Sequence, residues 1–175
     1  PFARWLVVAF FNPSLSEAVE RRFVLSRLGL DPAKKYLAFE FWKQRFFGEI
    51  SNELAVSVAP GSVTLLALHQ ATGAPQLLST SRHFTQGAIE LEDVEWSAPE
   101  RKLRGISTGP PHSAHDVFVH VPGSHPWTWG RYVLFRDSPG YTLKLVDENV
   151  MRVHVRFEDQ GRVPWKIDLG EFFGV

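Results

Sequence analysis

Residues 141–169 read YTLKLVDENVMRVHVRFEDQGRVPWKIDL, and this stretch decides the fold class. Apolar and polar side chains alternate in three runs, which are separated by the triplets DEN (147–149) and DQG (159–161). A period of two is typical of a strand with one buried face, and both triplets are typical turn sequences. The pattern predicts a three-stranded antiparallel meander.

The same alternation recurs towards the N-terminus. Residues 53–58 and 63–68 flank the turn sequence Pro60-Gly61-Ser62 and predict a β-hairpin. Residues 14–28 alternate and predict a strand ending in a short turn at 26–30, although Ser14 and Ser16 with nearby Glu leave a capped helix open. Further strands are expected at 88–96, 101–107 and 116–121. The expected fold is therefore all-β: a single antiparallel β-sandwich domain over 1–175, of Greek-key or meander type, with an additional C-terminal β-meander.

Bulk composition narrows the function classes. The chain has 175 residues, of which 44% are hydrophobic and 22% charged, as in a folded domain. Its 19 basic and 19 acidic side chains cancel, so we expect no nucleic-acid or membrane partner. The absence of cysteine excludes disulfides, thiolate metal sites and a cysteine nucleophile. Strand-like sequence follows Pro1 almost at once, and we interpret the chain as a piece of a longer polypeptide.

Polar clusters offer few candidates for catalysis. His112, His115 and His120 lie near Asp116, which keeps a cupin-like metal-dependent enzyme open as an alternative. We interpret these histidines as surface and loop residues, however, and expect no metal site. The acidic segment 90–95 resembles a glycosidase carboxylate pair but is explained more simply as a solvated strand. No nucleophile elbow or phosphate-binding loop is present, so we expect no catalytic residue and no cofactor in this chain.

The tryptophans divide into two groups. Trp127 and Trp129 are two residues apart and would project to the same side of an extended chain, next to His125. Exposed indoles suit the C–H faces of sugar rings, so these three residues are the candidate carbohydrate contacts, with burial in the core as the competing interpretation. The remaining four are interpreted as core residues: Trp5, Trp42, Trp96 and Trp165.

A series of short motifs runs through the middle of the chain. They are LGL (28–30), YLAFEFW (36–42), FGEI (47–50), VAPGSVTLLAL (58–68) and LSTSRHFTQG (78–87), followed by Trp96 and Leu103. In their order and spacing they resemble the C-terminal antiparallel β-domain of α-galactosidase-like (melibiase-type) glycoside hydrolases. The resemblance covers a little under half of the chain and does not reach the segment from His112 to Val175.

The resemblance implies a function that the residues alone do not. In that family two catalytic aspartates lie on a (β/α)₈ barrel that precedes the β-domain, so no catalytic position is carried over to this chain. The resemblance implies a non-catalytic accessory domain whose partner is a barrel of the same polypeptide, in a parent enzyme acting on α-galactosides or related sugars. It leaves a secreted or periplasmic parent open. A carbohydrate-binding module that uses Trp127 and Trp129 is the main alternative.

Overall fold

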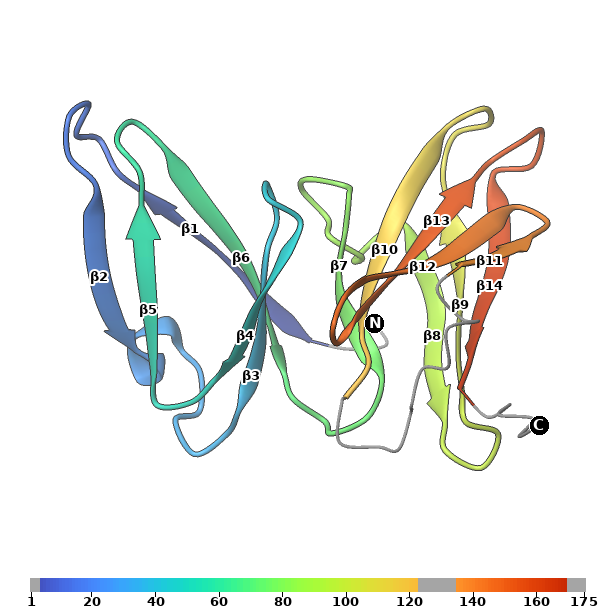
Figure 1. The fold of residues 1–175 in the computed structure, drawn as a ribbon, viewed down its shortest axis with the longest axis horizontal. Helices are drawn as coiled ribbons and strands as arrows, with labels where there is room; N and C mark the ends of the chain where they lie inside the picture. The colour runs from blue at the N-terminus through green and yellow to red at the C-terminus, as the bar shows by residue number, and fades with distance from the viewer. Residues whose placement is uncertain (1–3, 123–134, 170–175) are drawn as a thin grey trace. The chain divides into compact units, whose positions relative to one another are not determined.

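The computed structural model of the chain describes residues 4–122 and 135–169. The described residues form antiparallel strands and a single 3-10 turn, which confirms the predicted all-β antiparallel sandwich class (Figure 1). By their internal contacts they separate into two compact units, Arg4–Ala71 and the described part of Thr72–Val175. We had expected one sandwich over the whole chain. The structure instead gives each unit two sheets and a core cluster of its own.

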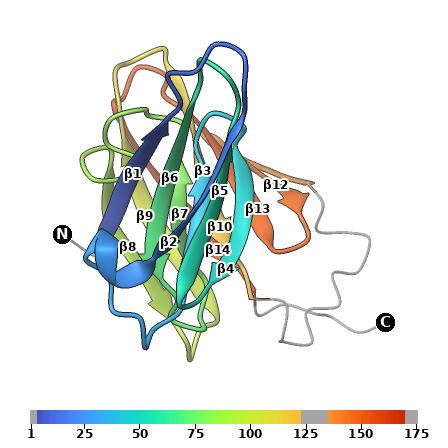
Figure 2. The ribbon, with the colours of Figure 1, turned by 90° about the vertical axis from the view of Figure 1, so that its left-hand side faces the viewer.

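The first unit packs a four-stranded sheet, in the order β1-β6-β3-β4, against the two-stranded sheet β2-β5. Figure 2 shows β2 and β5 side by side. The core between the sheets takes Leu66 from β6, Val56 from β5 and Leu25 from the 3-10 turn η1. The elements are β1 (Trp5–Phe11), β2 (Val19–Val24), η1 (Leu25–Leu28), β3 (Tyr36–Glu40), β4 (Arg45–Ile50), β5 (Glu53–Val58) and β6 (Val63–Gln70).

The hairpin predicted for residues 53–68 is wrong, although both of its strands exist. β5 pairs with β2, whereas β6 pairs with β1 on one side and β3 on the other. All six central residues of β6 are buried, and such a strand needs a hydrogen-bonded neighbour on each side. The turn at Pro60 therefore carries the chain from one sheet to the other. The side-chain amide of Asn12 anchors this crossing by donating to the carbonyls of Val58 and Ala59, each at 3.1 Å.

Residues 14–28 fold as the favoured interpretation expected, as a strand that ends in a short turn. The Ser14 hydroxyl accepts a hydrogen bond from the Glu17 amide at 3.1 Å, which closes a local turn before β2 rather than capping a helix. After β2, η1 ends at Gly29, whose φ of 74° lies in the left-handed region that glycine adopts without strain.

The second unit packs the sheet β11-β12-β13-β10-β7 against the sheet β14-β9-β8. Its core is filled by inward side chains of both sheets, among them Val153, Trp165 and Ile167. The elements are β7 (Gln76–Thr80), β8 (Leu91–Ser97), β9 (Lys102–Thr108), β10 (Ala114–His120), β11 (Phe135–Ser138), β12 (Tyr141–Asp147), β13 (Val150–Arg156) and β14 (Arg162–Asp168).

The prediction of a C-terminal three-stranded meander is wrong for the last strand. β12 and β13 pair as predicted, but β14 leaves them and pairs with β9 in the opposite sheet. All three strands carry the same alternation, so periodicity could not tell which sheet β14 joins. In this arrangement the apolar faces of β13 and β14 meet across the core, with Val155 on one strand and Trp165 on the other.

The four tryptophans expected in the core have different environments. Trp165 is buried and Trp96 packs against the same core while half-buried. Trp5 is half-buried and stacks on His69, with ring centroids 5.1 Å apart. The prediction is wrong for Trp42, which is 53% exposed because β3 ends at Glu40 and places it in the following turn.

Candidate functional site

Residues 81–90 form the loop between β7 and β8, the braced loop, and Glu90 at its end is buried. One carboxylate oxygen of Glu90 accepts hydrogen bonds from the Gly87 amide at 2.8 Å and from the Thr80 hydroxyl. The other accepts from the Ile89 amide at 3.3 Å. One buried acid therefore ties the two ends of the loop to each other.

The protonation of Glu90 follows from this arrangement. Burial raises the pKa of its carboxyl group, but hydrogen bonds from the Thr80 and Thr85 side chains and from backbone amides outweigh burial. The net pKa lies below the ordinary value of 4.5, so the group is an anion at neutral pH. A general acid needs the opposite shift, because it must hold its proton near neutral pH. The Glu90 carboxylate is therefore suited to fixing the conformation of the loop.

The acidic segment thus differs from the solvated strand that we expected. Glu92, Asp93 and Glu95 are exposed as predicted, but Glu90 lies before β8 and is buried. The strand carries a bulge between Glu92 and Glu95, where Asp93 has a φ of 50°. Turn-forming and polar residues dominate the sequence STSRHFTQG (79–87), and this composition is the signal that could have indicated a hydrogen-bonded loop here.

Gln86 is the second brace of the loop. It is fully buried, and its side-chain carbonyl accepts a hydrogen bond from the Ser79 hydroxyl at 3.1 Å. Its side-chain amide donates to the carbonyl of His83 at 3.3 Å. Gly87 follows with a φ of 114°, and a Cβ added there would lie 2.7 Å from Leu77. Together these contacts fix the backbone of the loop.

On its outer side the braced loop exposes two large apolar side chains. Phe84 is 91% exposed and Ile89 is 75% exposed. The Phe84 ring also contacts His83, with ring centroids 4.7 Å apart. Both apolar side chains are therefore exposed on a loop whose backbone is fixed by internal hydrogen bonds.

A buried polar centre lies inside the second unit. Nε2 of His115 is 2.8 Å from the Ser107 hydroxyl, which also accepts a hydrogen bond from the Trp165 indole at 3.1 Å. Burial, followed by the charge of Arg82, lowers the pKa of His115 from 6.5 to about 4, against the raising effects of Glu90 and Asp116. The imidazole is neutral at neutral pH and fills the core.

Asp116 has a partner that sequence spacing did not reveal. It lies directly opposite His154 in the β10–β13 pairing, and its carboxylate is 2.7 Å from Nδ1 of His154. Arg152 adds a weaker ion pair at 3.9 Å, and the Asp116 amide donates to the Ser81 hydroxyl at 2.9 Å. The pair therefore links the base of the braced loop to β13.

The histidines considered for a metal have separate environments. His112 is exposed and faces Asp159 at 3.7 Å, and His120 is half-buried. The interpretation as surface and loop residues is wrong for His115, which is buried on β10 because its side chain faces the core. Within residues 4–122 and 135–169 no group of three or more His, Cys, Asp or Glu side chains is arranged to hold a metal ion. The candidate carbohydrate contacts His125, Trp127 and Trp129 lie outside the described residues.

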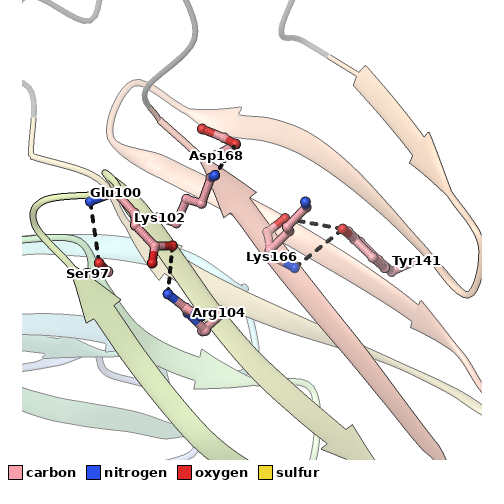
Figure 3. A network of polar contacts seen from close by, with 7 residues as sticks. All are labelled: Ser97, Glu100, Lys102, Arg104, Tyr141, Lys166 and Asp168. Atoms are coloured by element: carbon pink, nitrogen blue, oxygen red, sulfur yellow. Dashed lines mark hydrogen bonds and ion pairs between the residues drawn. The ribbon is translucent and has the colours of Figure 1, made fainter.

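Hollows of ligand size lie in both units of the described residues. One, of about 540 Å³, lies beside β9 and β14 in the second unit and is lined by Arg104, Ile106 and Trp165 among others. Arg104 forms an ion pair with Glu100 at 2.8 Å, and the Tyr141 hydroxyl hydrogen bonds to the backbone of Lys166 (Figure 3). Another, of about 750 Å³, lies in the first unit.

Comparisons with known proteins return nothing for this chain: no family model, no curated protein and no solved structure matches it. In the described ranges no helix has the length and apolar character needed to cross a membrane.

Proposed function

We propose that this chain is a non-catalytic accessory region of an α-galactosidase-like glycoside hydrolase. In this role it packs against a catalytic (β/α)₈ barrel that lies N-terminal in the same polypeptide, and stabilises it. The sequence resemblance supplies the family, and one of its longest motifs, residues 78–87, coincides with most of the braced loop.

The exposure of Phe84 and Ile89 on the braced loop carries this proposal. Full burial of one such side chain in an interface contributes about 1.5–3 kcal/mol. The buried carboxylate of Glu90 and the buried amide of Gln86 already hold the loop, so little conformational entropy remains to be lost on docking. A rigid loop with an aromatic tip is the kind of anchor that dominates protein interfaces.

The chemistry of the buried acid is consistent with this role. The Glu90 carboxyl group is ionised, and its oxygens already accept hydrogen bonds from within the chain. These features favour a role in holding the loop over a role in proton transfer. Under the proposal, bond cleavage belongs to the aspartates of the barrel, and the described strands supply a folded surface beside it.

The upstream reading frame is the first test. A barrel-sized coding stretch with two aspartates at the ends of barrel strands is expected there, and a frame without one would overturn the proposal. The isolated 175-residue chain should not hydrolyse p-nitrophenyl α-galactoside. Turnover by the isolated chain would also contradict the proposal.

The second test uses the full-length polypeptide that carries the barrel. Replacing Phe84 and Ile89 together by Ser should shorten the half-life of its p-nitrophenyl α-galactosidase activity at elevated temperature severalfold. Leu15→Ser is the matched control, since Leu15 is 89% exposed but lies on a loop of the first unit. A double variant that inactivates no faster than this control would refute docking through the braced loop.

A further inference from the structure

The 750 Å³ hollow of the first unit is a cleft whose lining is unusually charged. Arg21, Arg22, Lys43 and Arg45 line it together with the acids Glu20 and Glu40. Every residue of its lining belongs to Arg4–Ala71, so the cleft is complete within one compact unit.

Strand register shows which side chains face the interior of the cleft. Glu40 pairs with Leu66, a core residue, so its side chain lies on the inner face of the four-stranded sheet. Arg45 lies opposite Glu40 in the β3–β4 pairing and shares that face. Arg21 lies opposite Val56, another core residue, and so faces inward from the two-stranded sheet.

Cations in the cleft are short of acidic partners. Arg22 pairs with Glu53 at 2.5 Å, but for Arg21, Lys43 and Arg45 no ion pair is found among residues 4–122 and 135–169. Like charges facing one another across a cleft repel, and an anionic ligand relieves that repulsion. Arginine also offers the planar, two-pronged donor geometry that matches a carboxylate or a sulfate.

Glu40 adds the second, independent observation. Its side chain is buried, at 3% exposure, yet it lines the cleft. One carboxylate oxygen of Glu40 accepts a hydrogen bond from the backbone amide of Lys43. Within the described part of the chain, no protein donor hydrogen bonds to the other carboxylate oxygen. That second oxygen reaches the open cleft, where a water molecule or a ligand hydroxyl can donate a hydrogen bond to it.

We propose that this cleft binds a saccharide that carries an anionic group, either a sugar carboxylate or a sugar sulfate. The anionic group is neutralised by Arg21, Lys43 and Arg45. The second carboxylate oxygen of Glu40 accepts a hydrogen bond from a hydroxyl group of the sugar ring. Phe47, which packs on the core and also lines the cleft, offers an apolar wall for sugar C–H groups. An inorganic anion alone would use the cations but would leave the second oxygen of Glu40 to water.

The choice of a sugar over other hydroxylated anions rests on the proposed function. The inference that the cleft binds an anionic ligand does not depend on it. Binding is therefore measured on the isolated chain, without a barrel. Calorimetric titrations at low salt would compare four probes: trigalacturonate, galactose 6-sulfate, neutral galactotriose and inorganic sulfate. Failure here would leave docking through the braced loop intact, and failure of docking would leave this site intact.

We expect at least one of the two anionic sugars to bind about tenfold more tightly than both neutral galactotriose and inorganic sulfate. Arg45→Gln should weaken that binding about tenfold, and added salt should weaken it further. Arg27→Gln is the matched control, because Arg27 is exposed on η1 outside the cleft. Both substituted residues are exposed, so both variants should fold.

Four results would contradict the proposed site. Equal binding of inorganic sulfate would mean an adventitious ion only and would overturn the sugar site. Binding of neutral galactotriose as tight as that of the anionic sugars, or no binding by any probe, would overturn it as well. Loss of affinity in Arg27→Gln equal to that in Arg45→Gln would place the ligand elsewhere on the chain.

Discussion

The backbone amide of Gly87 donates a hydrogen bond to the side-chain carboxylate of Glu90 at 2.8 Å. This contact lies within the turn that reverses the chain between β7 and β8, and both residues are buried or nearly so. The buried carboxylate of Glu90 thus holds the backbone of the loop that exposes Phe84.

Glu90→Gln should destabilise the chain by about 1–3 kcal/mol, because glutamine keeps only one acceptor oxygen. If that oxygen accepts from Gly87 and Thr80, the NH2 group faces the Ile89 amide, and two donors meet. Urea unfolding at pH 7 measures the change. Glu95→Gln, on the strand β8 that follows the loop, is the control. Since Glu95 is exposed, its replacement should stay within about 0.5 kcal/mol. Equal effects of the two variants would contradict the buried brace.

Glu90 should also contribute to acid unfolding. Its pKa in the folded chain is below the ordinary 4.5, so its contribution is complete above pH 4.5 and is lost as the pH falls through the lowered folded value. In Glu90→Gln, the difference in stability from wild type should therefore shrink below about pH 4.5. A difference that stays constant down to pH 3 would argue against an ionised Glu90.

His115 should make stability depend on pH in a higher range. Its pKa is about 4 in the folded chain and near 6.5 when unfolded, so the unfolded chain binds the proton first. Stability should fall as the pH drops from 6.5 towards 4, and His115→Gln should flatten that slope in urea unfolding series. An unchanged slope in His115→Gln would exclude this role.

Gly105 and Trp165 should be energetically coupled. A Cβ at Gly105 would lie 2.5 Å from the Trp165 ring, and the two residues are opposite each other in the β9–β14 pairing. Gly105→Ala should therefore cost about 1–3 kcal/mol. In the Trp165→Leu background the added methyl group meets less obstruction, so the cost should shrink. Strict additivity of the two changes in a double-mutant cycle would contradict direct packing.

Phe84 should matter little to the isolated chain. It is 91% exposed, so Phe84→Ser should change the free energy of unfolding by less than about 0.5 kcal/mol. Phe157→Ala should cost about 3–5 kcal/mol, because Phe157 is buried in the core and packs edge-on against His115. Comparable losses in thermal melts of the two variants would mean that Phe84 stabilises the fold itself rather than serving a partner.

The candidate site was predictable only in part. Residues 78–87 stood out only as a motif of the family resemblance, and the acid at position 90 was interpreted as part of a solvated strand. Its burial depends on the Thr80 hydroxyl and on the Gly87 amide meeting one carboxylate, and this meeting follows from the path of the loop. The Asp116–His154 pair joins residues 38 positions apart, a distance at which spacing along the chain carries no signal.

The sequence by itself determined the strands that alternate clearly, such as β5, β12, β13 and β14, because two-residue alternation of apolar side chains is a local property of each segment. It did not indicate β4 (RFFGEI) or β7 (QLLST), which lack that alternation. Only the tertiary structure decided the partners: β5 with β2, β14 with β9, and two cores in place of one. Strands with the same alternation present similar apolar faces, so their pairing is settled by which combination buries those faces together and satisfies the backbone hydrogen bonds across the whole chain.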